Sequence, residues 1–291
     1  MRPLNIIVLA KQVPDTRNVG KDAMKADGTV NRGALPAIFN PEDLHALEQA
    51  LRVKDSFPET TITVLTMGPV RAAEIIREAL YRGADKGILL TDRKFAGSDT
   101  LATSYALATA IKRFGNFDIV FAGRQAIDGD TAQVGPQVAE KLNVPQVTYA
   151  EEILHIDENN IRVKRRLERG VEVVESTFPL VITVHSSAPA CRTRHAKKLM
   201  KFKHARTSTE LQQLAEDYIT LQNDRPYLQI EEWSVADIAA NDELLGLSGS
   251  PTKVKKIENV VLQAKETKVL ADNDFDIDAL MKDLITNHTI G

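Results

Sequence analysis

The sequence of 291 residues contains a single cysteine, Cys191. One thiol cannot form an internal disulfide framework or a thiol redox pair, and it cannot ligate a cluster within this chain. Any redox activity would therefore require a bound cofactor. Long hydrophobic runs are also lacking, because the apolar stretch near the N-terminus covers only about seven residues before Lys11, too few for a signal-peptide core or a membrane span. We expect a cytoplasmic protein without stable membrane insertion.

Excess charge of one sign is absent as well. Lys and Arg number 37 and Asp and Glu number 40, for a formal net charge of -3, so nucleic acid is not expected as a partner. The six histidines show no two-histidine helical spacing beside a carboxylate pattern, and no G-x-S-x-G elbow occurs. We therefore expect neither a metal site nor a catalytic residue supplied by the chain itself.

Short apolar runs alternate with amphipathic stretches from residue 4 to residue 184. With 43% hydrophobic residues, this alternation predicts an α/β protein built on a mostly parallel sheet. Helices are expected to begin after Asn40, Gly68, Asp99 and Gly129, with Asn40 as N-cap before a first-turn proline and with Ser98 and Asp99 as a second cap. Strands rich in β-branched residues are expected at residues 5–10, 61–67, 87–91, 118–123, 146–150 and 180–185.

The pattern changes after residue 150. Alternating segments up to residue 176 predict an antiparallel meander, and a basic run with seven Lys or Arg follows between Arg192 and Arg206. Beyond residue 207 the sequence becomes irregular and polar, with a loop at 248–253 and a terminal helix at 275–285. We expect a nucleotide-binding domain over residues 1–206 and an extended arm over residues 207–291.

The stretch GRQAIDGDTAQVGP, residues 123–136, follows an expected strand. It is not a calcium loop opened at Asp128, because Ala132 and Ala139 occupy two ligand positions, and it is not a Walker loop, because its glycine spacing is one residue too long. Helix starts at the carboxyl edge of a parallel sheet present free N–H groups to an anion. The stretch therefore favours a nucleotide cradle, with glycines and prolines that only shape turns as the alternative.

Several motifs in order resemble the beta subunit of electron transfer flavoprotein. The resemblance is continuous from about residue 4 to residue 206 and returns at SGSPTKV. The motifs are VLAKQVPDT, NPEDLHALEQAL, MGPVRAAEIIREALYRGADKGILLTDRKFAGSDTLATSYALA, GRQAIDGDTAQVGP and VKRRLERGVEVVESTFPLVITV.

The resemblance implies a doubly wound fold of the adenine nucleotide alpha hydrolase-like kind, with a C-terminal arm that contacts an alpha subunit carrying FAD. The beta subunit of this family holds a second nucleotide, which is structural AMP in housekeeping members and FAD in electron-bifurcating members. The motif DGDTAQVGP resembles the corresponding motif of the bifurcating members, so we expect FAD, with AMP as the alternative.

In a bifurcating member, NADH would reduce this FAD. One electron would pass to a low-potential acceptor, a ferredoxin or flavodoxin, and the other through the alpha-subunit FAD to an acyl-CoA-type or other flavin dehydrogenase. A nucleotide-dependent ligase or a stress-type adenine-binding domain is a third alternative. It would need a Ser- and Gly-rich loop after the first strand, where this chain has AKQVPDT.

The resemblance also implies a set of nucleotide contacts. Gly123 and Gly129 would let backbone approach a phosphate, and N–H groups at the next helix start would face the pyrophosphate. Asp128 or Asp130 would cap that helix or accept from ribose, and Arg124 would place positive charge near a reduced flavin or pair with one of these aspartates. The full set is Leu9, Ala10, Asn40, Met67, Gly123, Arg124, Gln125, Asp128, Gly129, Thr131, Ala132, Gln133 and Val134.

A partner-recognition loop is implied between Pro189 and His204. Family members commonly have a glutamate, a proline-arginine-tyrosine run and an exposed leucine here, but this chain reads APACRTRHAKKLMKFKHA, with Ala196 in place of the leucine. The basic character would steer an acidic partner surface. The expected contacts are Arg192, Ala196, Lys197, Met200 and Lys201.

Overall fold

The computed structural model describes residues 2–15, 36–213, 223–252, 269–287 and 289–290. Within these residues, nine strands form one sheet in the order β11-β5-β4-β1-β6-β10-β7-β8-β9, parallel from β11 to β7. A separate antiparallel pair is formed by β2 (Gln12–Pro14) and β3 (Ala37–Phe39). The strands of the sheet are β1 (Asn5–Leu9), β4 (Thr61–Met67), β5 (Lys86–Leu90), β6 (Ile119–Gly123), β7 (Gln146–Ile156), β8 (Asn160–Leu167), β9 (Gly170–Thr177), β10 (Leu180–Val184) and β11 (Glu231–Trp233).

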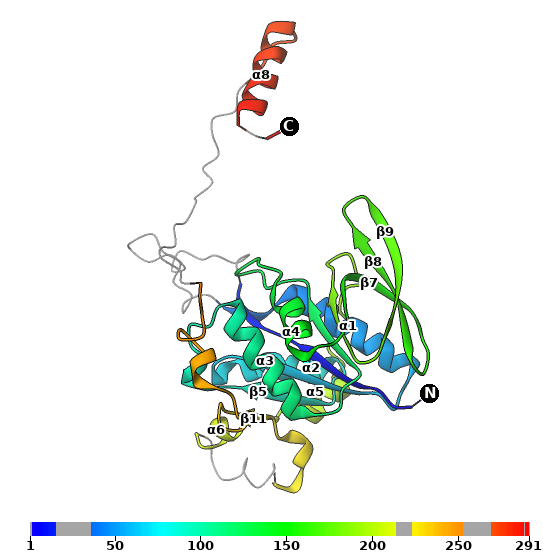
Figure 1. Cartoon of the computed structure of the whole chain (residues 1–291), viewed down its shortest axis with the longest axis vertical. Helices are drawn as coiled ribbons and strands as arrows, with labels where there is room; N and C mark the ends of the chain where they lie inside the picture. The colour runs from blue at the N-terminus through cyan, green and yellow to red at the C-terminus, as the bar shows by residue number, and fades with distance from the viewer. Residues whose placement is uncertain (1, 16–35, 214–222, 253–268, 288, 291) are drawn as a thin grey trace.

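Helices cover both faces of the parallel part of the sheet (Figure 1). Strands between two helical layers bury both faces, which is why their sequences are nearly continuous apolar runs. One face carries α1 (Pro41–Ser56), α2 (Ala73–Arg82) and α5 (Ala196–Phe202); the other carries α3 (Thr100–Phe114) and α4 (Val134–Leu142). This arrangement confirms the doubly wound, mostly parallel α/β fold.

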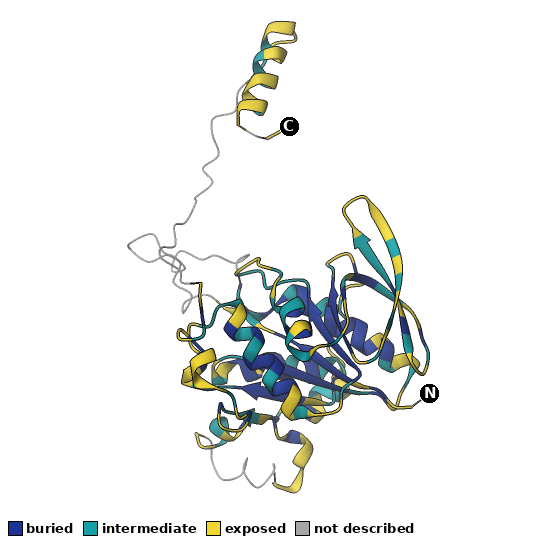
Figure 2. Cartoon of the chain, in the orientation of Figure 1, coloured by how far each residue is buried: buried dark blue, intermediate teal, exposed yellow. Residues whose placement is uncertain are grey.

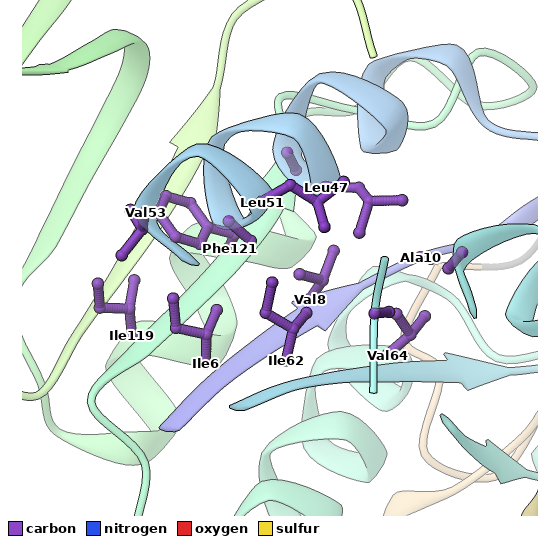
Figure 3. Close-up of a cluster of buried hydrophobic side chains, with 14 of the residues drawn as sticks. Ile6, Val8, Ala10, Leu47, Leu51, Val53, Ile62, Val64, Ile119 and Phe121 are labelled. Carbon is purple, nitrogen blue, oxygen red and sulfur yellow. The ribbon is translucent and has the colours of Figure 1, made fainter. Parts of the chain in front are cut away.

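Alternate residues of β1 belong to different cores. Ile6 and Val8 lie with Leu47 of α1 (Figure 3), whereas Ile7 and Leu9 pack in the second cluster with Leu107 of α3. Adjacent strand side chains point to opposite faces, so a single apolar run serves both layers. Because β1 is fixed from both sides, its carboxyl end is a rigid support for a binding site.

The six expected strands are confirmed, and each begins within one residue of its expected start. Among the helices, α1 begins at Pro41 and α3 begins after Asp99, as expected. The start of α4 differs from the expectation, because the helix begins at Val134 and not directly after Gly129. Two intervening residues, Asp130 and Ala132, have φ of 50° and 52°, a left-handed conformation that interrupts a right-handed helix.

The expected antiparallel meander is formed by β7, β8 and β9. β7 is longer than the expected 146–150, because its second half pairs with β8 beyond the parallel sheet. The β8–β9 hairpin projects from the domain and is largely exposed (Figure 2). Val171 and Val173 leave about half of their surface exposed on this hairpin.

The segment at residues 223–252 packs on the sheet domain. Its strand β11 extends the sheet next to β5, and Leu228 and Ile230 join the core on the α1 side. These residues therefore pack as part of the sheet and its core, and the expected division at residue 206 stays a prediction. By contrast, α8 (Asp274–Thr286) has no buried residue and lies apart from the sheet in Figure 1. In the described part of the chain, no helix is both long and apolar enough to cross a membrane.

Candidate nucleotide site

A pocket of about 370 Å³ lies at the carboxyl ends of β1, β4 and β6. The chain winds from β1 to β4 and β5 on one side and continues with β6 on the other side, so the sheet order reverses between β1 and β6. Ligands of open α/β sheets bind in the crevice outside such a switch point. The topology therefore places the pocket where this fold binds small molecules.

Most of the expected nucleotide contacts line this pocket. Asn40 and Asp128 are not among the residues that line it, and their expected contacts with a nucleotide stay predictions. Asn40 is fully buried behind the loop, and the Asp128 carboxylate accepts from Lys11 Nζ at 2.7 Å. The expected residues that line the pocket are Leu9, Ala10, Met67, Gly123, Arg124, Gln125, Gly129, Thr131, Ala132, Gln133 and Val134.

Further lining residues lie on segments that carry no nucleotide motif of their own. One group, from β4, β6, α3 and the 3-10 turn Arg93–Phe95, forms an apolar floor, and a second group, around the start of α3, forms a polar rim. Ser98 and Asp99 were expected as a helix cap and, as a weaker alternative, as residues that line a nicotinamide site. The floor residues include Leu65, Phe95, Leu107 and Ala122, and the rim residues include Gly97, Ser98, Asp99, Thr100 and Thr103.

Residues 129–135 form a loop that also lines the pocket and has backbone donors without acceptors among the described residues. The N–H groups of residues 131–135 donate to no acceptor in the described part of the chain. Helix α4 has Gln133 at its N-cap without a side-chain cap, so its first donors stay free. Free N–H groups at a helix start attract an anion. This cradle fits a phosphate or pyrophosphate group.

The aspartates of the loop do not cap α4, contrary to expectation. Asp128 pairs with Lys11, and Asp130 accepts from Gln125 Nε2 at 2.7 Å. Both carboxylates therefore stabilise the loop before the helix and leave the helix N-terminus open. The physical reason is the left-handed backbone at Asp130 and Ala132, which separates the aspartates from the first turn of α4.

Three glycines of the stretch have different surroundings. A Cβ on Gly123 would lie 2.6 Å from the backbone carbon of Glu42, and one on Gly135 would lie 2.4 Å from Cγ2 of Thr183. A Cβ on Gly129 would meet nothing within 4 Å, although Gly129 lines the pocket. Gly123 and Gly135 therefore serve close packing within the protein. Only Gly129 leaves space that a ligand could fill.

Arg124 brings positive charge to the pocket wall. Its Nη2 donates to Glu42 Oε1 at 3.2 Å, and its buried Nε has no partner among the described residues. It pairs with Glu42 and not with Asp128 or Asp130. Burial lowers the pKa of His185, and the charge of Arg124 lowers it further. The Nε of Arg124 thus remains a hydrogen-bond donor without an acceptor among the described residues, and Arg124 lines the pocket.

Asp43 lies in the first turn of α1 and reaches the pocket from behind. Its carboxylate accepts from the N–H of Lys11 at 2.8 Å and from the N–H of Gly123 at 3.1 Å. Burial raises the pKa of Asp43 to about 7, although the side chain of Asn40 and these two N–H groups favour its charged form. Asp43 thus joins the carboxyl ends of β1 and β6 at the switch point.

The rim is closed by contacts between distant segments. Thr100 Oγ1, at the start of α3, donates to Gln133 Oε1 at 2.9 Å. Asp99 accepts from two N–H groups of α3 and from the N–H of Thr252, and Ser250 Oγ accepts from the N–H of Asp99. The segment around residue 250 is thereby attached to the pocket rim.

The expected partner-recognition residues lie on and before α5. Arg192 is not free for a partner, because it pairs with Glu48 and Asp55 of α1. Met200 is 61% exposed, and the ammonium of Lys201 lies 4.8 Å from the ring centre of Tyr227. Ala196 and Lys197 are also exposed. The structure thus presents a basic surface with one exposed thioether.

Comparison with known proteins is consistent with this geometry. Residues 27–208 match the electron transfer flavoprotein domain. The chain is 44% identical, over 87% of each chain, to the electron transfer flavoprotein subunit beta of Clostridium acetobutylicum. It is 42% identical, over 86% of each chain, to the caffeyl-CoA reductase-Etf complex subunit CarD of Acetobacterium woodii. It is 43% identical, over 87% of each chain, to the acryloyl-CoA reductase electron transfer subunit gamma of Anaerotignum propionicum. The chain belongs to the electron transfer flavoprotein family, as a beta subunit.

Proposed function

We propose that the pocket of this beta subunit binds FAD and that the chain takes electrons from NADH in an electron-bifurcating flavoprotein. The observation that carries the proposal is the free N–H cradle at residues 131–135, which lines the pocket at the carboxyl ends of β1, β4 and β6. FAD has two ring systems joined by a pyrophosphate. A cradle between a loop wall and an apolar floor suits such a dinucleotide.

The residues of the pocket would bind and orient the cofactor. The N–H groups at the start of α4 would hold the pyrophosphate, and the apolar floor at Leu65 and Leu107 would contact a ring. Arg124 would favour extra negative charge on that ring. Bound FAD would accept an electron pair from NADH and release the electrons one at a time. The chain itself would contribute placement and charge.

The proposed partners follow from family membership and from the surface of α5. An alpha subunit with its own FAD would form the heterodimer, with α8 and the preceding segment as the contacting arm. A ferredoxin or flavodoxin would take the low-potential electron. The names of two relatives, a caffeyl-CoA and an acryloyl-CoA reductase subunit, favour an acyl-CoA-type flavoenzyme as the other acceptor.

The α5 surface would receive that enzyme. Lys197 and Lys201 are exposed beside Met200, and such a basic surface attracts acidic partners in a salt-dependent manner. Reversing the charge of Lys197, Lys198 and Lys201 should lower turnover with the partner dehydrogenase most strongly at low ionic strength. Equal kinetics at every salt concentration would assign the run to solvent.

A second candidate is structural AMP in the same pocket. The cavity of about 370 Å³ is near the lower end of the range for ligand pockets, roughly 300 to 1,000 Å³, which favours the smaller nucleotide. In that case the chain would support electron transfer by the alpha subunit alone. Both candidates use the same N–H cradle, so they differ in what occupies the floor.

The deciding experiment counts nucleotides in the purified heterodimer. Extraction should yield two FAD and no AMP, and anaerobic NADH should bleach the flavin. One FAD with one AMP and no bleaching would reject the FAD proposal in favour of AMP. Gly129→Val should empty this pocket alone, because the new side chain meets no protein atom near its Cβ but occupies the ligand space. Full occupancy of both sites in Gly129→Val would show that no phosphate approaches this glycine.

A further inference from the structure

Asn40 stands at the N-cap of α1 but does not cap the helix. The residue is fully buried, and its side chain makes no capping hydrogen bond to the first turn of α1. Its Nδ2 donates to the carbonyl of Gln125 at 2.9 Å, and its Oδ1 accepts from the N–H of Ile127 at 3.3 Å. The amide is therefore bound through both of its polar atoms to the loop after β6.

Helix α1 begins without a side-chain cap from Asn40. Pro41 has no N–H to satisfy, and the backbone carbonyl of Asn40 accepts from the N–H groups of Asp43 and Leu44 at 3.0 and 3.2 Å. An N-cap asparagine normally gives its side-chain oxygen to the N–H of the second or third helical residue. Here that oxygen serves a segment 87 residues away in sequence.

The loop depends on this contact for its buried support. Residues 125 and 126 line the pocket and precede Gly129. The side-chain ties from Lys11 to Asp128 and from Gln125 to Asp130 are exposed, and the tie from Arg124 to Glu42 is partly buried. Exposed polar contacts contribute little to holding a loop in place, whereas a buried amide with both groups satisfied contributes more. Among these side chains, Asn40 is the one that is fully buried.

We propose that Asn40 is a positioning residue of the nucleotide pocket, holding the 125–127 segment so that Gly129 and the N–H groups of residues 131–135 face the ligand. Asn40 itself does not line the pocket. The inference rests on the proposed function, because it takes the pocket ligand to be a nucleotide. It applies to FAD and AMP alike, since both carry phosphate to the same cradle.

Two substitutions separate the loop contact from the helix start. Asn40→Ser keeps a good N-cap residue, but its hydroxyl sits closer to the backbone than the amide and does not reach the carbonyl of Gln125 and the N–H of Ile127. Asn40→Asp also keeps a cap and retains the acceptor for Ile127, but it places a carboxylate oxygen against the carbonyl of Gln125. Asn241→Ser is the matched control, because Asn241 caps its own 3-10 helix η5 (Asp242–Leu244) by accepting from the N–H of Glu243 at 3.0 Å.

Three quantities should be measured on the full chain freed of nucleotide: the dissociation constants for FAD and for AMP, the hydrogen-exchange rate of the Ile127 amide, and the midpoint of urea unfolding. Loss of two buried hydrogen bonds from the loop predicts that Asn40→Ser weakens nucleotide binding on the order of tenfold. Exchange at Ile127 should accelerate, and the unfolding midpoint should fall, because the two buried hydrogen bonds are also lost from the chain without ligand. Asn40→Asp should weaken binding at least as much, and Asn241→Ser should leave the dissociation constants unchanged.

The outcomes distinguish this inference from the proposed function. Wild-type affinity in both Asn40 variants would overturn the positioning role. Weakened binding with an unchanged exchange rate at Ile127 would overturn it as well, since the loss of affinity would then not arise from the loop. If the wild-type chain binds neither FAD nor AMP, the nucleotide proposal fails. Ile127 exchange then still tests the tie, because an unchanged rate in Asn40→Ser would overturn it independently of any ligand.

Discussion

The starts of α1 and α3 carry similar sequence signals but have different structures. Each helix follows a short polar residue, Asn40 or Asp99. The carboxylate of Asp99 accepts from the N–H groups of Leu101 and Ala102 at 2.9 and 3.0 Å and caps its own helix. The amide of Asn40 instead forms its hydrogen bonds with the loop after β6. A carboxylate only accepts hydrogen bonds, whereas an amide both donates and accepts, and the loop offers one carbonyl and one N–H.

The two helix starts therefore contribute differently to the pocket. The α3 start forms part of the pocket wall, because Asp99 and Thr100 line the rim. The α1 start supports the pocket from behind, where Asn40 and Asp43 attach to backbone groups of the loop and the strand ends. Changes at α3 should act first on helix stability, and changes at α1 should act on the geometry of the pocket.

The largest effect is expected where β6 touches the α1 start. Gly123→Ala would place its Cβ 2.5 Å from Asp43 Oδ1 and 2.7 Å from the backbone nitrogen of Asp43. Backbone cannot yield as a flexible side chain does, so the free energy of unfolding should fall by about 3 kcal/mol or more. Urea unfolding at constant pH measures this loss.

Gly129→Ala is the matched control for Gly123→Ala. Its Cβ would meet no atom within 4 Å, so stability should remain within about 0.5 kcal/mol of the wild type. Equal losses in the two variants would show that the contact between β6 and α1 is not the reason for glycine at position 123.

The next effect is a pH dependence of opposite sign at the two helix starts. The pKa of Asp43 is raised to about 7 by burial, from roughly 3.9 in an unfolded chain. Its contribution to stability is therefore full below about pH 4 and is lost as the pH rises toward 7. The free energy by which the wild type exceeds Asp43→Asn should decrease by a few kcal/mol across this window and then level off.

Asp99 provides the contrasting pH dependence. Burial opposes ionisation, but hydrogen bonds from the N–H groups of Ala102, Thr252 and Leu101 outweigh it and lower the pKa of Asp99. Its contribution is therefore present above the unfolded pKa and is lost as the pH falls below about 4. Slopes of the same sign for Asp43→Asn and Asp99→Asn in urea unfolding would contradict this comparison.

A smaller effect is expected from removing the cap of α3. Asp99→Ala should lower the free energy of unfolding by about 1 to 2 kcal/mol at pH 7, because two N–H groups lose their acceptor. Asp99→Asn should recover most of the loss, since asparagine is an equally good N-cap. A rescue by asparagine would distinguish capping from the charge of Asp99, and its failure would make the charge the cause.

Local sequence pattern predicted the elements that depend on local physics. The runs at Asn5–Leu9 and Leu180–Val184 were recognised as strands because β-branched apolar residues suit a sheet buried on both faces. The cap at Asp99 was also recognised, because its partners lie two and three residues away. The short strand Glu231–Trp233 was missed, because its pairing with β5 depends on an edge formed by distant residues.

The candidate site was predicted only in part for the same reason. Family resemblance indicated the segments that meet at the switch point, but it did not predict the hydrogen bonds of Asn40 to the loop after β6. The partners of Asn40 are 85 and 87 residues away, and no local pattern encodes that pairing. The late start of α4 was missed as well, since nothing in an alanine at position 132 signals a left-handed backbone with φ of 52°.

The smallest effect is expected from the exposed tie of the same loop. Lys11 Nζ lies 2.7 Å from Asp128 Oδ1, but the lysine side chain is 48% exposed, so the pair should contribute about 0.5 kcal/mol or less. Asp128→Asn should therefore weaken nucleotide binding less than Asn40→Ser does, and salt should reduce the difference from the wild type. Isothermal titration with FAD and with AMP at low and high salt would measure it. If Asp128→Asn instead weakened nucleotide binding as much as Asn40→Ser, the ion pair would hold the loop as firmly as the buried amide does. The hydrogen bonds that Asn40 makes away from its own helix would then not be the main support of the pocket.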